Sequence, residues 1–224
     1  MKNEKREEEV NEMNVAIKAI AIGDVKSLKQ NDKVASSAIE KSTISSANVS
    51  LLGIEGDAQA DLKNHGGPDK AICAYFFEHY SFWEEKLDKS LSFSAFGENI
   101  TLQGTTEKEI RIGDIFKVND VLLQVSQPRQ PCFKLGLKHE QPKMPVWVRE
   151  TGYTGFYFRV LQEGTFTINH SFERVETNLT YPTLEQANEL MYGAHPNKEA
   201  IKEIIEVNEL SESWKKQFKK RINQ

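Results

Sequence analysis

The strongest constraint on the fold is a series of short β-like segments, separated by turn residues, between Val15 and Glu176. Pairs such as Gly23-Asp24 and Gly113-Asp114 mark turns, and the segments between them are rich in Val, Ile, Thr and Phe. This pattern predicts strands at 15–22, 42–54, 99–102, 109–112, 115–118, 121–126, 155–161 and 165–168. Many short strands at such close spacing are typical of a barrel or a sandwich.

Helical spacing interrupts this pattern within the β region. Residues 79–87 place Tyr80, Trp83 and Leu87 on one face, at spacings of three and four, and predict a helix. Residues 145–150 predict a second, shorter one.

After Tyr181-Pro182 the chain changes to helical spacing throughout. Thr183 with Gln186 has the pattern of a capping box, and Asn197 and Ser211 are N-cap candidates for two further helices. Three such helices bury little apolar area alone. We therefore expect them to pack against the β domain or against a partner subunit, which makes a homodimer one of the expected arrangements.

The expected fold class is thus mainly β with α: a β-barrel or sandwich with a few helices, followed by a small three-helix module. We predict a flexible leader at 1–14, a β domain at 15–176 and the three-helix C-terminal module at 181–224. A length of 224 residues fits one domain of this size with a small addition.

Charge and hydropathy narrow the classes of partner. The net charge of −4 gives no reason to expect nucleic-acid binding, and the basic cluster at 215–221 is interpreted as a solvated helix end. No segment is long and apolar enough to span a bilayer, and the charged N-terminus has no signal-peptide pattern. We expect a cytoplasmic protein with no membrane partner, whose two cysteines stay reduced.

The segment that ends at Cys132 is the leading candidate for chemistry. Pro128 and Pro131 stiffen its backbone, and Arg129 lies three residues before the cysteine. A nearby permanent positive charge favours the thiolate, which attacks electrophiles and binds soft metals. The alternative is a proline-rich loop with a shielded thiol. Cys73 lies in an apolar run and is interpreted as a buried core thiol.

Two further patches could bind a ligand. Gly66 and Gly67 can form an anion-binding backbone nest, with His65 and Lys70 on either side as donors. The alternative is a tight loop with an incidental histidine. Asn99 follows a Gly-Glu turn and could bind a polar ligand through its amide, although the residues alone favour a structural turn. Cys-x-x-Cys and paired-histidine motifs are absent from the sequence, which argues against a metal site made of protein ligands alone.

In their order and spacing, these motifs together resemble the MOSC domain, which is shared with the C-terminal part of molybdenum-cofactor sulfurases. The resemblance covers about 15–176, and the helical tail resembles the module that follows this domain in the YiiM-like subgroup. The motifs that carry it are Gly56-Asp57, His65-Gly66-Gly67, Lys70-Ala71, Phe96-Gly97-Glu98-Asn99, Gly113-Asp114, Gln127-Pro128-Arg129-Gln130-Pro131-Cys132 and Gly155 with Arg159 and Gly164.

The resemblance implies a β-barrel that binds the molybdenum cofactor, a phosphorylated pterin dithiolene carrying Mo. It implies Cys132 as the catalytic residue and Mo ligand, or as the carrier of a persulfide. The residues that would then bind the cofactor are His65, Gly66, Gly67, Lys70, Asn99, Gln127 and Arg129.

The implied activity is an oxidoreductase that reduces N-hydroxylated small molecules, such as 6-N-hydroxylaminopurine, in detoxification. Since the sequence has no flavin, haem or iron–sulfur motif, electrons would come from a separate reductase. Two alternatives stay open at this point. Cys132 could deliver sulfur to metal centres as a persulfide carrier, or the chain could be a cofactor-binding module without chemistry.

Overall fold

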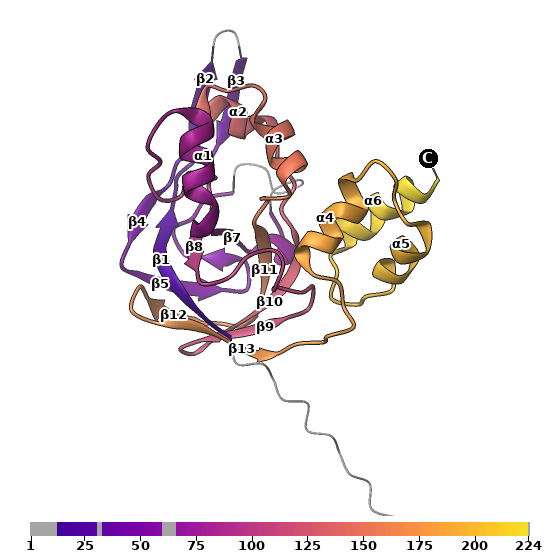
Figure 1. Cartoon of the computed structure of the whole chain (residues 1–224). Coiled ribbons are helices and arrows are strands. Elements are labelled where there is room, and N and C mark those ends of the chain that lie inside the picture. The colour runs from indigo at the N-terminus through magenta and orange to yellow at the C-terminus, as the bar shows by residue number, and fades with distance from the viewer. Residues whose placement is uncertain (1–12, 31–32, 60–65, 224) are drawn as a thin grey trace, which may run out of the picture.

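The computed structural model describes residues 13–30, 33–59 and 66–223. Seven strands of an eight-stranded sheet close into a barrel in the order β13-β9-β10-β11-β7-β8-β1, and the pairing of β13 with β1 completes the ring. Figure 1 shows this barrel with the helical module beside it. The strands are β1 (Asn14–Ile22), β7 (Ile72–Phe76), β8 (Ile100–Gln103), β9 (Ile115–Val118), β10 (Val121–Pro128), β11 (Phe156–Gln162) and β13 (Ser171–Glu176).

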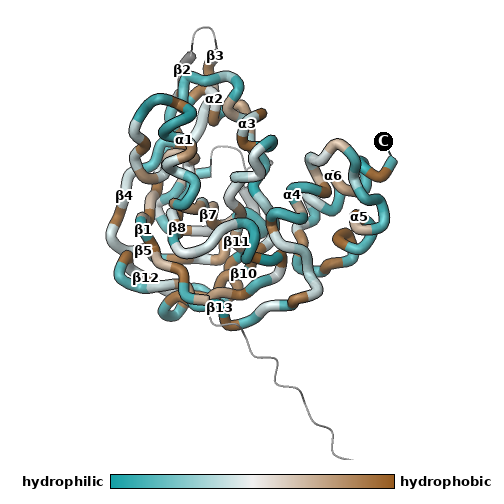
Figure 2. Tube along the Cα trace, viewed as in Figure 1, coloured by the Kyte–Doolittle hydropathy of each residue, from teal (hydrophilic) through white to brown (hydrophobic). Residues whose placement is uncertain are grey.

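Six of the seven contacts around the barrel are antiparallel, and the β7–β8 contact is parallel. Burial alternates along the first part of β1, as expected for a strand with one face on a core, and residues 19–21 are all buried. Figure 2 shows hydrophobic and hydrophilic residues mixed along the strands of the barrel wall. The barrel interior is therefore a packed core, with Ile20, Phe116 and Phe158 among its buried side chains.

The remaining strands form extensions of the barrel. The strand β4 (Ser42–Ile44) pairs with β1, and β5 (Ser46–Ser50) pairs with β12 (Gly164–Thr167) and β6 (Gly53–Ile54). The strands β2 (Lys26–Gln30) and β3 (Lys33–Ser37) form a separate hairpin.

Three helices and the β2–β3 hairpin gather at one end of the barrel (Figure 1). The helices are α1 (Tyr80–Leu87), α2 (Phe133–His139) and α3 (Met144–Thr151), with short 3₁₀ turns at η1 (Pro68–Lys70) and η2 (Phe77–His79). They enclose a second core in which the rings of Tyr75 and Phe96 stack at 4.0 Å. Trp83 donates to the Tyr75 hydroxyl at 2.6 Å, so the buried indole N–H is satisfied.

The C-terminal module consists of α4 (Leu184–Tyr192), α5 (Lys198–Ile205) and α6 (Glu212–Ile222). The predicted capping box of Thr183 and Gln186 is confirmed, as are the caps at Asn197 and Ser211. Trp214 and Phe218 of α6 are fully buried in the same apolar cluster as the barrel strands. The expectation that the module packs against the barrel is therefore met within one chain. None of the helices in the described ranges has the length and hydropathy needed to cross a bilayer.

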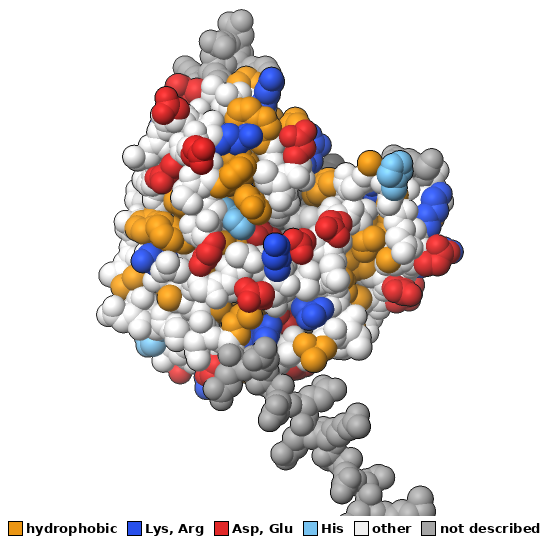
Figure 3. All heavy atoms as spheres, in the orientation of Figure 1, with side chains coloured by type: hydrophobic (Ala, Val, Ile, Leu, Met, Phe, Trp, Pro, Cys, Tyr) orange, Lys and Arg blue, Asp and Glu red, His pale blue; other side chains and the backbone are white. Residues whose placement is uncertain are grey.

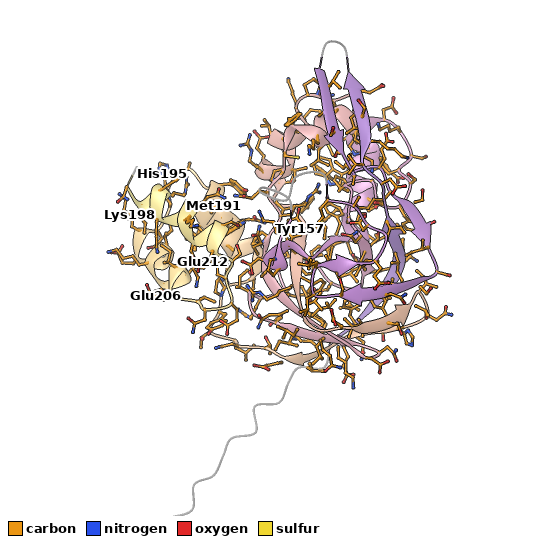
Figure 4. All side chains as sticks on the ribbon, turned by 180° about the vertical axis from the view of Figure 1, so that it is seen from behind. Tyr157, Met191, His195, Lys198, Glu206 and Glu212 are labelled. Carbon is orange, nitrogen blue, oxygen red and sulfur yellow. The ribbon has the colours of Figure 1, made fainter. Side chains whose placement is uncertain are left out.

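The outer side of the module is polar. Figure 4 places His195 and Lys198 on the side of the module that faces away from the barrel. Arg221, in the basic cluster at 215–221, donates to the carbonyl oxygens of Leu190 and Gly193 at the end of α4. Its charge therefore interacts with the negative end of that helix. On the face in Figure 3, acidic and basic side chains are interspersed rather than gathered in one patch.

The predicted mixed fold is confirmed, and most of its predicted strands are present with shifted ends. Two predictions were wrong in detail: 42–54 is three strands rather than one, and 109–112 forms a single bridge from Arg111 to Thr183. The sequence patterns did not predict the strands β2, β3, β7 and β13 or the helix α2. The strand β7 reads as a continuous apolar run because it is buried on both faces, so it lacks the alternation that identifies a half-buried strand.

Candidate functional site

A cavity of about 90 Å³ lies where the β2–β3 hairpin, β7, β11 and the segment after β10 meet. Among the described residues that line it, four are basic and one is a carboxylate, so the lining is positively charged. These are Lys41, Lys70, Arg129, Lys134 and Asp57. The cavity also contains both cysteines of the chain, Cys73 and Cys132. Such a lining attracts anions and offers thiol ligands.

Cys132 stands where an extended segment meets a helix. The segment leaves the sheet at Pro128, the backbone N–H of Arg129 donates to Gly155 at 2.9 Å, and Cys132 takes the N-cap position of α2. Its extended backbone (φ −122°, ψ 166°) matches the stiff, non-helical segment predicted between the prolines. The thiol is half-buried and forms no disulfide. It is therefore available to a ligand in the cavity.

Arg129 is buried against this thiol, with 7% of its surface exposed. Among the described residues no carboxylate lies within 4.0 Å of its guanidinium, and its side-chain partner is the Tyr157 hydroxyl. Burial lowers the pKa of Arg129, but the nearby Cys73, Tyr157 and Cys132 groups outweigh burial and raise it. A buried guanidinium of this kind is stabilised by an anion, and the cavity is where one can bind.

Tyr157, labelled in Figure 4, comes from β11 and lines the same cavity, on the opposite face of the strand from the core residues Phe156 and Phe158. Burial raises the pKa of its hydroxyl well above the ordinary value, so the group stays neutral near pH 7. A neutral hydroxyl can accept from the guanidinium of Arg129 and still donate a hydrogen bond.

The structure revises the interpretation of Cys73. The thiol is buried as expected, at 6% exposure in β7, but it faces the candidate site rather than the apolar core. Burial raises the pKa of Cys73 to about 11, and Arg129 only partly offsets this. At neutral pH Cys73 is therefore a protonated thiol, which makes it a weak nucleophile and a weak metal ligand beside the more exposed Cys132.

Asn99 lines the cavity, but its amide is occupied within the protein. Its Oδ1 accepts from the backbone N–H of Cys73 at 3.0 Å, and its Nδ2 donates to Ala21 at 3.2 Å and to Asp57 at 2.8 Å. The amide thus ties β1, β7 and the Asp57 loop together. The geometry gives Asn99 a positioning role rather than the direct cofactor contact expected from sequence.

The carboxylate of Asp57 accepts hydrogen bonds from three residues on this side of the cavity. Its Oδ1 accepts from the backbone N–H of Gly23 at 2.8 Å and forms a close ion pair with Lys41, and its Oδ2 accepts from Asn99. The side chains of Lys41 and Asp57 are only 5% and 9% exposed. The charge of Lys41 is therefore balanced by Asp57, whereas Arg129 has no carboxylate within 4.0 Å among the described residues.

Three other predicted site residues lie differently. Gln127 does not line the cavity: its fully buried Oε1 accepts from Ser211 at 2.7 Å and Ser213 at 2.9 Å, so it faces the helical module. This corrects its predicted role. Gln127 is still part of β10 and faces the module, whereas β10 ends at Pro128, so the direction of the Arg129 side chain is not set by the strand. Gly66 and Gly67 precede η1 and do not line the cavity, although Gly67 has the positive φ (92°) expected of a glycine nest. His65 lies outside the described residues.

Lys70 joins the site as predicted, at the end of η1. The carbonyl of the neighbouring Asp69 accepts from Ser126, and its carboxylate pairs with Arg159 at 2.6 Å, which fixes the turn against β10 and β11. Sequence reasoning missed Lys41, Lys134, Tyr157 and the cavity position of Cys73. Of these, only Lys134 had a signal, because it lies two residues after Cys132.

The profile of the MOSC domain matches residues 61–173, and the profile described as "YiiM-like, 3-alpha helix domain" matches residues 182–224. A Bacillus subtilis (strain 168) protein, "Uncharacterized protein YflK", is 43% identical over 92% of this chain and 94% of its own length.

A solved structure, YiiM from Geobacillus stearothermophilus, is 37% identical with a TM-score of 0.79, over 93% of this chain and 99% of that one. A Gibberella moniliformis (strain M3125 / FGSC 7600) protein named "Reductase" is 38% identical over 51% of this chain and only 21% of its own length. Matching profiles for both parts, and relatives that match over more than nine tenths of both chains, show that this chain belongs to the MOSC domain family and carries the three-helix module of its YiiM-like members.

Proposed function

We propose that this protein binds the molybdenum cofactor and reduces N-hydroxylated compounds, such as 6-N-hydroxylaminopurine. One observation supports this most strongly: a half-buried thiol and a buried guanidinium without a carboxylate partner among the described residues share one positively charged cavity. A soft thiolate suits a metal–sulfur centre, and the cations suit the anionic phosphate and dithiolene. Membership of the MOSC family and the fungal relative named as a reductase add support.

In this proposal Cys132 is the protein ligand of molybdenum. Arg129, Lys70 and Lys134 contact the anionic parts of the cofactor, while Asp57 and Asn99 keep the opposite wall in place. The cavity of about 90 Å³ has room for the metal end or the phosphate, so the pterin would extend beyond it. His65 stays a predicted contact, since it lies outside the described residues.

When bound, the cofactor would supply the two-electron oxygen-transfer chemistry that side chains cannot provide. The residues of the chain bind and orient: Tyr157 holds the Arg129 guanidinium, and the neutral Cys73 thiol leaves Cys132 as the metal-binding sulfur. Electrons would come from a separate reductase.

Metal content tests the proposal. Wild type, Cys132→Ser and Cys73→Ser are purified from a host that makes the cofactor, and bound molybdenum is measured. We expect near one equivalent in wild type and Cys73→Ser, and a loss of at least about tenfold in Cys132→Ser, since the proposed sulfur ligand of the metal is removed. Equal, low molybdenum in all three proteins would contradict the ligand role.

Two further readouts separate the alternatives. With a chemical reductant such as reduced methyl viologen, the loaded protein should convert 6-N-hydroxylaminopurine to adenine, and Cys132→Ser should not. Intact mass measured before and after cyanide treatment reports a persulfide. A cyanide-labile sulfur on Cys132 without molybdenum would favour the sulfur-carrier alternative instead. Bound molybdenum without turnover would favour a cofactor-binding module.

A further inference from the structure

The segment that carries Arg129 and Cys132 is held from behind by the C-terminal module. Ser126, Gln127 and Gln130 of this segment all contact the N-cap or first turns of α6. Arg129 and Cys132 line the cavity on the other side. The segment 126–132 is therefore a strap between the candidate site and α6.

The strongest of these contacts is a reciprocal amide pair. Gln130 donates to Gln217 at 2.6 Å, and Gln217 donates back to Gln130 at 2.8 Å. The Tyr192 hydroxyl of α4 also bonds the Gln130 side chain. Two parallel hydrogen bonds fix the orientation of an amide as well as its distance, because both groups must stay coplanar.

A second set of contacts lies one turn earlier on α6. Ser211 and Ser213 both donate to Gln127, at 2.7 and 2.9 Å, and the backbone N–H of Ser211 donates to the Ser126 carbonyl at 3.0 Å. These groups are part-buried or buried, so losing a partner carries a desolvation cost.

The helix that makes these contacts is itself firmly placed. Trp214 and Phe218 are fully buried in the cluster that continues into the barrel. On α6, Trp214 directly follows Ser213, and Phe218 directly follows Gln217. Strap and helix therefore have little freedom to move apart without opening a packed core.

We propose that Gln217 and Ser213 are positioning residues, through which the three-helix module sets the place of Arg129 against the Cys132 thiol. They touch no ligand and act only through Gln130 and Gln127. The placement itself does not depend on the proposed function, although its value for catalysis does.

The placement can be measured with two alkylating reagents of different charge. Iodoacetate is an anion and iodoacetamide is neutral, so the ratio of their rates at Cys132 reports the positive charge beside the thiol. The protein is purified from a host that cannot make the cofactor, and alkylation of the Cys132 peptide is followed by mass spectrometry. Arg129→Gln gives the value of the ratio without the guanidinium.

We expect Gln217→Ala to lower the ratio at least about threefold towards that of Arg129→Gln, because the guanidinium is no longer held at the thiol. Lys216→Ala, an exposed neighbour on the same helix, is the matched control and should keep the wild-type ratio. Ser213→Ala should lower the ratio less, since Ser211 still bonds Gln127. It serves in place of Gln217→Ala if that variant does not fold.

If the module only stabilised the fold, the outcome would differ. A loosened module would then change the access of both reagents to Cys132 alike, and the ratio of the two alkylation rates would stay as in wild type. An unchanged ratio in folded Gln217→Ala and Ser213→Ala would overturn the proposal, whatever the molybdenum content of the loaded protein turns out to be.

Discussion

The two thiols in the cavity should differ sharply in reactivity. Cys73 and Cys132 line the same site, but Cys73 is buried and its pKa is raised to about 11 from the ordinary value of 9.0. The thiolate is the reactive form, so ionisation alone predicts slow alkylation of Cys73. The perturbation is treatment of the native protein with iodoacetamide at pH 8.

The magnitude follows from the shift. The rise in the pKa of Cys73 from 9.0 to about 11 lowers its thiolate fraction at pH 8 about 100-fold, to about 0.1%, before any steric protection is counted. Burial and the Arg129 charge act in opposite directions on Cys73, with burial the larger. Removing the charge in Arg129→Gln should therefore raise the pKa of Cys73 further and slow its alkylation more.

The assay is peptide mass spectrometry over time, with urea-denatured protein as the reference for each cysteine. Native Cys73 should react at least about 100-fold more slowly than in the denatured chain, and its rate should increase through pH 11. Alkylation of native Cys73 within about tenfold of its denatured rate would refute the reasoning from burial.

The same shift has a consequence for stability. Because the pKa of Cys73 is higher in the folded chain than its ordinary value, the folded state binds this proton more tightly. This stabilising contribution is complete below pH 9 and is lost as the pH rises through about 11. Urea unfolding of wild type and Cys73→Ala across this pH range measures the contribution of Cys73 to the free energy of unfolding. An identical pH dependence of the unfolding free energy in both proteins would contradict this contribution.

Four further substitutions test the fold around the site, each by urea denaturation. Asp57→Ala leaves the buried Lys41 charge unpaired and should cost about 3–5 kcal/mol; an unchanged midpoint would mean that the pair contributes nothing. Trp214→Ala should cost about 3–5 kcal/mol, whereas Phe133→Ala, at 59% exposure, should change stability by less than about 0.5 kcal/mol. Gly155→Ala places a Cβ 2.4 Å from a β7 carbonyl at a φ of 65°, so a stability loss below about 1 kcal/mol would be unexpected.

Local signals in the sequence were reliable where the physics is local. The capping residues Thr183, Asn197 and Ser211 cap the helices that they were predicted to begin. A side chain and a backbone N–H two or three residues apart settle a cap without any tertiary contact. The stiff frame of Cys132 was predictable for the same reason, since the prolines restrict the backbone directly.

Other predictions failed where a residue's neighbours come from distant segments. Asn99 and Gln127 both had amides suited to a ligand, but one is occupied by β1, Cys73 and Asp57 and the other by the module serines. Sequence distance hides such competition: Gln127 and Ser211 are 84 positions apart. The cofactor roles of His65, Lys70 and Arg129 stay predictions.

By itself the sequence determined a β domain followed by a helical module, the caps at which the module's helices begin and the extended backbone that carries Cys132. Those features follow from side-chain periodicity, capping and restricted backbone angles, which act within a few residues. Only the tertiary structure decided which side chains share the cavity and that α6 supports the strap behind Arg129. Closure of the barrel brings Lys41, Cys73, Cys132 and Tyr157 together from four separate segments, and no local pattern encodes that meeting.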